Sequence, residues 1–311
     1  MVSVLAASIA AIGGLWYSNV QAHHANEQAR EERMLHKEGQ VTDRYTAAVD
    51  NLGENKVDVR LGGVYALQRI MQDSPRDQPT VANILATYVR THATAPPPKG
   101  QDLPADVLAA FIALTARDVS YDQGFLPNLR GARLPRVDLT SSARGAKAAL
   151  GETDLRGADL RHAFLSDADL SGANLDKANL RRAALDGADL REAGLAKADL
   201  RDANLYGALL NGAGLPHSDL RRANFREARM MAASLYRSDL SGAYLSDADL
   251  RRAQLVGADL RGADLTRADL RKADLTGADL RGADLRNATV TKKQIDTART
   301  DDTTKPPPAL T

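Results

Sequence analysis

The sequence predicts a mainly β solenoid, preceded by an N-terminal transmembrane helix and a small α-helical region. Three observations carry the solenoid. Residues 153–287 run as 27 consecutive pentads without an insertion, and the central residue is Leu in 25 of them, so a period of five governs much of the chain. Ala stands two residues before the centre in 24 pentads, which fixes a second small apolar position. Aromatic residues make up only 4% of the chain, so its core must consist of small and aliphatic side chains.

A period of five requires a chain that turns a corner once per pentad. In an α-helix five residues rotate by about 500°, so successive Leu side chains would spiral around the axis. In a flat strand an odd period sends successive Leu side chains to opposite sides. A corner in each pentad lets the Ala and the central Leu both point inward. The other three residues then point outward or form the turn, where Gly is frequent.

The string ADLRGADLTRADLRKADLTGADLRGADL at residues 258–285 resembles the A-(D/N)-L-x-x signature of the pentapeptide-repeat family. This resemblance implies a right-handed quadrilateral β-helix with four pentads in each coil. At about 4.8 Å per coil, roughly seven coils form a rod about 33 Å long. We expect the β-helix to span residues 121–290, with one or two degenerate starting coils at Asn128–Leu139 and a loop where Ser141–Lys147 breaks the phase.

Residues 1–22 are expected to form a transmembrane anchor. Val2–Val20 carries no charge, and a segment of this length fits roughly 30 Å of hydrocarbon. Trp16 and Tyr17 lie at its end, as in an interfacial aromatic belt. Two alternatives stay open: a cleaved signal peptide, although a basic leading region is lacking, and a buried core helix. Lys and Arg follow the segment and none precedes it, so we expect a single-pass protein of the bacterial cell membrane with its soluble part in the cytoplasm.

Residues 23–93 predict a stalk helix and a helical hairpin. The stretch from His23 to Leu52 is polar and favours a helix, and an apolar stripe in its later half allows a parallel homodimer. Two further helical patterns, one on each side of residues 72–79, predict the hairpin. Asp77 is expected to cap the second of these helices, and the Gly62–Gly63 pair is expected to let it approach closely. The strings DRYTAAVDNLG at residues 43–53 and VRLGGVYALQRIMQDSPRDQPTVANILATYVR at residues 59–90 resemble the helical part of membrane-associated bacterial pentapeptide-repeat proteins.

Residues 94–120 predict a Pro-rich linker followed by an amphipathic helix. The stretch APPPKG at Ala95–Gly100 is typical of a stiff spacer, and an SH3-type ligand is the alternative. Leu103–Arg117 has the apolar spacing of a helix. Residues 291–311 are expected to form a short C-terminal helix and a Pro-rich tail.

The outward positions of the pentads are not random. Residues numbered 9 modulo 10 are Asp in ten of thirteen repeats, and those numbered 1 modulo 10 are Arg in nine of thirteen, which predicts paired Asp and Arg columns on two opposite faces. These columns are interpreted as solvated ladders, with a docking strip as the alternative. Pro216-His217 and Arg229-Met230-Met231 depart from the repeat and suggest a bulge. The two less charged faces hold the candidate contact residues for a protein partner, Tyr206, Tyr236, Tyr244 and Val256.

The sequence offers no chemistry for an enzyme. There is no cysteine, no Gly-rich phosphate loop and no nucleophile motif, and only His23 and His24 are neighbouring histidines, so we expect no catalytic, cofactor or metal site. The leading hypothesis is a membrane-tethered scaffold that binds an unknown protein and no nucleic acid. The alternative is a DNA mimic that interacts with gyrase, as some pentapeptide-repeat proteins do in quinolone resistance. Residues 150–290 hold 21 Lys and Arg against 22 Asp and Glu, which imitates duplex phosphate poorly.

Overall fold

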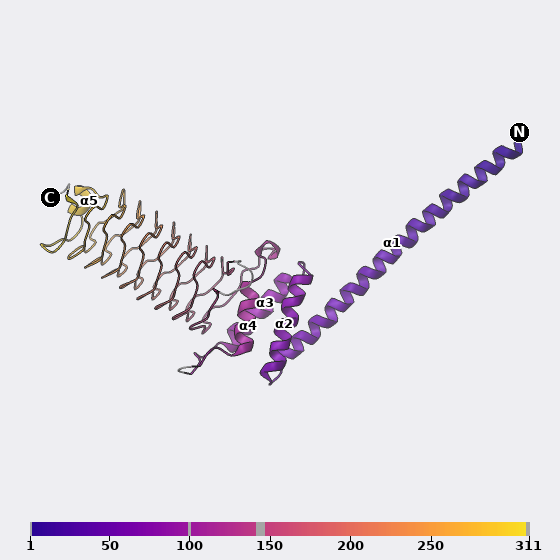
Figure 1. Ribbon diagram of the computed structural model, residues 1–311, viewed down its shortest axis with the longest axis horizontal. Coiled ribbons are helices and arrows are strands. Elements are labelled where there is room, and N and C mark those ends of the chain that lie inside the picture. The colour runs from indigo at the N-terminus through magenta and orange to yellow at the C-terminus, as the bar shows by residue number, and fades with distance from the viewer. Residues whose placement is uncertain (1, 99–100, 141–146, 309–311) are drawn as a thin grey trace.

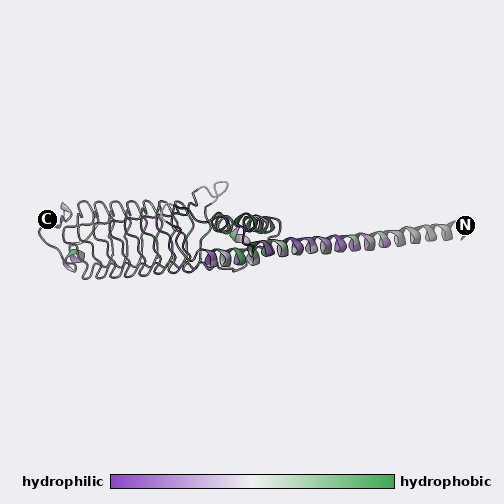
Figure 2. Cartoon of the chain, turned by 90° about the horizontal axis from the view of Figure 1, so that it is seen from below, coloured by the Kyte–Doolittle hydropathy of each residue, from purple (hydrophilic) through white to green (hydrophobic). Residues whose placement is uncertain are grey.

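The computed structural model describes residues 2–98, 101–140 and 147–308. Figure 1 shows three parts in chain order: a long helix, a cluster of short helices and a four-sided rod. The helices are α1 (Val2–Leu52), α2 (Val57–Asp73), α3 (Gln78–His92) and α4 (Ala105–Thr115), followed by the 3-10 turn η1 (Val119–Tyr121), and α5 (Lys292–Asp296) lies near the far end of the rod. α1 and the rod extend to opposite sides of the helical cluster, enclosing a wide angle in Figure 1 and lying nearly in line in Figure 2.

The expected anchor and stalk are one helix. α1 continues without a break through residue 22, where the sequence suggested a boundary, and ends at Leu52. Within the described ranges, no helix is both long and apolar enough to cross a membrane.

The helical cluster is built on the end of α1. Buried Ala48 and Leu52 lie at the end of α1 where it packs against α2, and α4 packs against both α2 and α3. The sequence assigned the close approach to the wrong pair of helices. A Cβ on Gly63 would lie 2.7 Å from the carbonyl oxygen of Ala48, so this glycine brings α2 against α1. Asp77 is the residue before α3, but its carboxylate accepts a hydrogen bond from Ser74 and does not cap the helix.

A buried polar contact fixes the three short helices to one another. The Asp106 carboxylate on α4 accepts hydrogen bonds from Arg60 Nε on α2 (2.6 Å) and from the Tyr88 hydroxyl on α3 (2.5 Å). Burial of Tyr88 and, as the second cause, its hydrogen bond to Asp106 raise the pKa of Tyr88 to about 12. Removing one partner of such a buried charged pair leaves the other uncompensated, so the contact specifies how the helices meet.

The rod consists of coils of four pentads. Parallel β-bridges join residues 20 apart from Ala149↔Asp169 to Asp279↔Arg299, which confirms the four-sided coil. The preceding bridges, from Asn128↔Asp154 to Asp138↔Phe164, join residues 26 apart, so the starting coil contains six extra residues. The expected loop at 141–147 falls there, and nearly all of it lies outside the described residues. Bridges at Arg299 and Lys305 extend the ladder beyond residue 290, because α5 replaces one side of the last coil.

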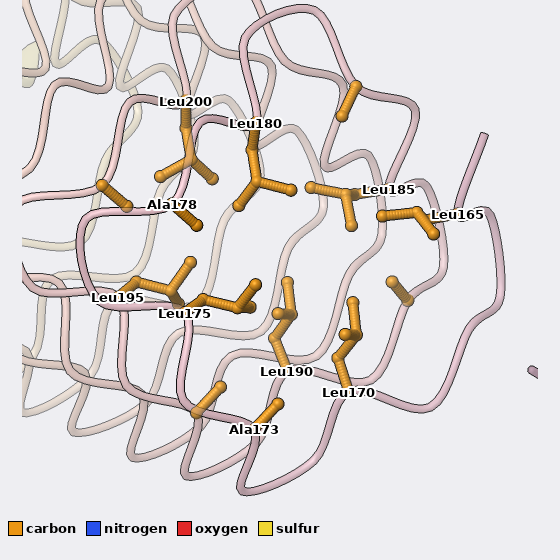
Figure 3. Close-up of a cluster of buried hydrophobic side chains, with 14 of the residues drawn as sticks. Leu165, Leu170, Ala173, Leu175, Ala178, Leu180, Leu185, Leu190, Leu195 and Leu200 are labelled. Carbon is orange, nitrogen blue, oxygen red and sulfur yellow. The ribbon is translucent and has the colours of Figure 1, made fainter. Parts of the chain in front are cut away.

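Each corner is a tight turn. The amide of the inward Ala donates to the carbonyl of the central Leu three residues earlier, as in Ala263 to Leu260 (3.0 Å). The second turn residue has a positive φ, 63° at Gly262, which a glycine adopts without steric cost. The predicted inward set is confirmed: Leu260 and its equivalents are buried, and Figure 3 shows Leu and Ala side chains pointing into the rod. Ser218 and Ser238 replace Ala and donate to the carbonyls of Leu195 and Leu215.

Both ends of the rod are covered. At the first coil the amides of Arg133 and Ala149 donate to the carbonyls of Ala93 (2.7 Å) and Thr115 (2.8 Å) in the helical region. At the other end Gln294 Nε2 on α5 donates to the carbonyls of Leu270 (2.7 Å) and Ala273 (2.9 Å). These contacts occupy backbone groups that an open β-edge would offer to another chain.

Candidate functional site

The four faces of the rod are defined by the bridged residue of each pentad. Face 1 carries the series Asp154 to Asp274, face 2 the series Asp159 to Asp279, face 3 the series Phe164 to Asp284, and face 4 the series Asp169 to Asp269. Because consecutive pentads form consecutive sides, faces 1 and 3 are opposite, as are faces 2 and 4. The Asp columns lie on faces 2 and 4, as the sequence predicted.

Most of the Asp charge on these two faces is neutralised inside its own pentad. In a representative pair, the Arg261 guanidinium donates to both oxygens of Asp259 (Nε–Oδ1 2.9 Å, Nη2–Oδ2 2.6 Å), and the amide of Arg261 donates to Oδ1. This hydrogen bonding holds the pKa of Asp259 below its usual range. The same arrangement recurs in the pairs Asp159–Arg161, Asp189–Arg191, Asp199–Arg201, Asp219–Arg221, Asp249–Arg251, Asp269–Arg271 and Asp279–Arg281. The columns therefore present a neutral, hydrogen-bonded surface.

The structure separates the four candidate contact residues into two groups. Tyr236 and Val256 are partly buried neighbours on the corner between faces 1 and 2. Tyr206 lies on the corner between faces 3 and 4, and Tyr244 lies on face 3; both are exposed. Arg226 follows Tyr206 in its column and covers the Tyr244 ring at 4.4 Å, so it links this second pair. A hydrogen bond with Glu227 raises the pKa of Tyr206.

A band without acidic residues runs across faces 4 and 1 and connects the two groups. We define it as residues 208–217 and 228–237, which contain no Asp or Glu. The two stretches are stacked in neighbouring coils through Leu209↔Arg229 and Gly214↔Ser234. The expected bulge is absent, since the ladder continues through both stretches with its 20-residue register. Met230 is buried in the place of a central Leu, and Pro216 takes a first turn position that suits its fixed φ.

The band also gathers the unpaired Arg residues of the rod. Residues 150–290 contain 18 Arg, and 14 of them lie within 4.0 Å of a carboxylate oxygen. The remaining four, which form no ion pair with the described residues, are Arg226, Arg229, Arg237 and Arg252. Arg229 and Arg237 belong to the band, while Arg226 and Arg252 border it. Sequence reasoning missed this cluster, although the loss of Asp at positions 209 and 229 was a visible signal.

The helical region contains a second candidate, a cleft. A cleft of about 840 Å³ lies between α1 and the α2–α3 connection, lined by residues that include Val41, Tyr45, Ile70 and Asp77. In the described part of the chain, no three His, Asp or Glu side chains are arranged to hold a metal ion. The band is therefore the feature that sets one part of the rod apart from its repeats.

The fold and this outer surface define the class of protein, which is a β-solenoid of four-sided coils with Leu and Ala inside. The family model described as pentapeptide repeats matches residues 153–191, 173–212, 198–235, 210–247, 228–267 and 253–291. The chain belongs to the pentapeptide-repeat family, whose fold is the right-handed quadrilateral β-helix.

Three solved structures illustrate the similarity. HetL, a pentapeptide repeat protein involved in heterocyst differentiation regulation from the cyanobacterium Nostoc sp. strain PCC 7120, is 34% identical over 58% of this chain and 81% of its own, with a TM-score of 0.19. Rfr23 from the cyanobacterium Cyanothece 51142 is 31% identical over 38% and 66%, with a TM-score of 0.23. Full-length QnrB1, a plasmid-mediated fluoroquinolone resistance protein, is 20% identical over 56% and 92%, with a TM-score of 0.28. No curated protein matches the sequence.

Proposed function

We propose that this chain is a scaffold without catalytic activity, and that its rod binds another protein through the acid-free band. The observation that carries the proposal is the coincidence, at one place on the rod, of missing carboxylates, four unpaired Arg residues and partly exposed apolar side chains. Elsewhere on faces 2 and 4 the regular Asp–Arg pairs neutralise each other.

The energetic cost of desolvation favours the band over the Asp–Arg columns as a docking surface. A partner that covers a paired column must dehydrate two charges that already satisfy each other. In the band, by contrast, Met231 is 37% exposed, and Leu209, Pro216 and Tyr236 are partly exposed. Covering such side chains is favourable, and an unpaired guanidinium can gain a carboxylate from the partner.

Gyrase interaction by DNA mimicry is the alternative function. A DNA mimic needs a dense negative surface, and here the Asp columns carry their own Arg partners. We therefore expect residues 41–311 to leave quinolone inhibition of gyrase unchanged in a supercoiling assay. Protection at micromolar protein would favour the mimicry alternative over the scaffold.

Attachment to the bacterial cell membrane by residues 1–22 is a further part of the proposal. The uncharged stretch Val2–Val20 supports it, and the Lys and Arg residues that follow favour a cytoplasmic rod. The full chain should stay in the membrane fraction after alkaline carbonate washing, and a fusion reporter after residue 311 should be active only in the cytoplasm. Release by carbonate would contradict the anchor.

Site-specific photo-crosslinking tests the docking surface. A benzophenone amino acid replaces Met231 in the band, and the matched control replaces Ser241, which lies half a coil further on, at the opposite corner of the rod. We expect a discrete crosslinked species in cells carrying the Met231 probe and none with the Ser241 probe. Equal crosslinking at both corners would contradict a docking role for the band.

A further inference from the structure

We infer that the partner of the band is an extended protein segment that carries both carboxylate and aliphatic side chains. This inference rests on the proposed function and adds the chemistry of the partner. The inference follows from the charges in the band, from the small size of its side chains and from the hydrogen bonds that its backbone already makes.

The cationic groups are spread along the band. Arg226, Arg229 and Arg237 belong to one coil and run from the corner between faces 3 and 4 to the corner between faces 1 and 2. Arg252 lies one coil further, in the column that contains Gly212 and Ala232. The side chain of Arg229 forms no hydrogen bond or ion pair with the described residues, and the Arg237 guanidinium lies 5.1 Å from the centre of the Tyr236 ring. Carboxylates at intervals along a partner segment would match this spread.

The relief between these groups is low. Gly212, Gly214, Ala232 and Ser234 have small side chains or none, and a Cβ on Gly214 would meet only Pro216 Cδ, at 4.0 Å. Leu209, Met231 and Tyr236 supply the apolar contacts around them. This surface has little relief and continues around the corner between faces 4 and 1. Such a surface suits an extended segment better than a rigid globular protrusion.

The backbone of the band is not free to pair with a new strand. The Leu209 and Ser234 amides donate to the carbonyls of Ala188 and Ala213, and the Arg229 carbonyl accepts from Leu210, so the ladder uses these groups. The partner must therefore be recognised by its side chains, which is why its composition, rather than its β-propensity, decides binding.

Charge argues against the two other classes of occupant. A second copy docked band to band would bring unpaired Arg residues against each other without any carboxylate between them. A nucleic acid long enough to cover the band would extend onto face 2, where Arg201 and Arg221 are already paired with Asp199 and Asp219 and offer its phosphates no free cation.

Peptide binding to the full-length chain tests the inference. The probe is a fluorescent 16-residue peptide of Leu-Ser-Glu-Ser repeats, which places Leu and Glu on one side when extended. We expect saturable binding that weakens with salt, and no binding of a Leu-Ser-Lys-Ser peptide. Replacing Arg229→Ala and Arg237→Ala together should weaken binding by about tenfold or more, since both removed charges face the peptide. The control pair Arg261→Ala and Arg281→Ala removes the same net charge outside the band and should change affinity less than about twofold.

Charge reversal supplies the second test. The double variant Arg229→Glu, Arg237→Glu should lose the acidic peptide and gain the Lys peptide. The inference is overturned by equal losses in the band and control variants, by binding of both peptides alike, or by no binding of the acidic peptide. Band-dependent binding of a single-stranded oligonucleotide, or concentration-dependent dimerisation that Arg229→Ala alters, also overturns it. Crosslinking at Met231 without acidic-peptide binding would retain the scaffold function and reject only this partner chemistry.

Discussion

At the scale of single residues, the fold depends on whether a side chain points into the rod or outward. Leu260 is fully buried among the stacked Leu and Ala side chains of the rod. Its neighbour Arg261 is about half exposed and points outward, with its guanidinium on Asp259 and its Nε 4.0 Å from Asp279. One step along the chain thus separates an apolar interior from solvent.

Leu260→Asp should unfold the rod, whereas Arg261→Asp should leave it folded. An unpaired carboxylate in a dry apolar column costs several kcal/mol, comparable with the whole stability of an ordinary domain. Arg261→Asp removes a surface ion pair, and such pairs contribute little to stability. Circular dichroism with thermal melting of the full-length chain measures both. Equal tolerance of the two substitutions would contradict the inward and outward assignment.

At the scale of the elements, the junction between α1 and α2 depends on one of two adjacent glycines. Gly63 faces α1, where an added Cβ would lie 2.7 Å from the Ala48 carbonyl oxygen and 3.1 Å from Asn51 Cβ. Gly62 has nothing within 4 Å. The two positions therefore separate helix packing from helix propensity in the same turn.

Gly63→Ala should destabilise the helical region and Gly62→Ala should stabilise it. The first substitution overpacks the α1–α2 contact at a cost of about 1–3 kcal/mol. The second replaces a glycine in an open helical position and should gain up to about 1 kcal/mol. Urea denaturation of the full chain, followed by its helical circular-dichroism signal, gives both values. A common sign for the two variants would show that α1 does not pack against Gly63.

At the scale of the whole molecule, the near-zero net charge arises from local pairs of opposite charge. Hydrogen bonds from Arg191, Arg251 and Arg281 lower the pKa values of Asp189, Asp249 and Asp279, and the same cause acts in most other pentads with this pair. The rod is thus held by many weak pairs of one kind, which respond together to pH.

The rod should lose stability when acidified. A carboxyl group whose pKa is lower in the folded than in the unfolded chain contributes stability that is present above its unfolded pKa of about 3.9 and is lost as the pH falls through the folded value. The melting temperature should therefore stay high between about pH 5 and 7 and fall below about pH 4. A scanning-calorimetry series across this range measures the effect. A melting temperature that is constant or rises at low pH would contradict the stabilising role of the pairs.

The sequence by itself determined the coil and its interior. A corner in each pentad is the local arrangement that buries every central Leu, and every repeat has this same pattern. The four-sided rod and the Asp and Arg columns were therefore predictable from periodicity and the family signature. The tertiary structure decided the contacts that no repeat encodes. Gly63 packs against α1, and the helical region covers the first coil. The expected anchor and stalk form the single helix α1.

The candidate site was only partly predictable for the same reason. Tyr236 and Met231 could be recognised as outward residues, and the family signature already implied the 20-residue register that stacks Leu209 on Arg229. The unpaired state of Arg229 and Arg237, in contrast, depends on distances to every neighbouring carboxylate. A period fixes where a side chain points, whereas pairing between coils depends on what lies beside it in space.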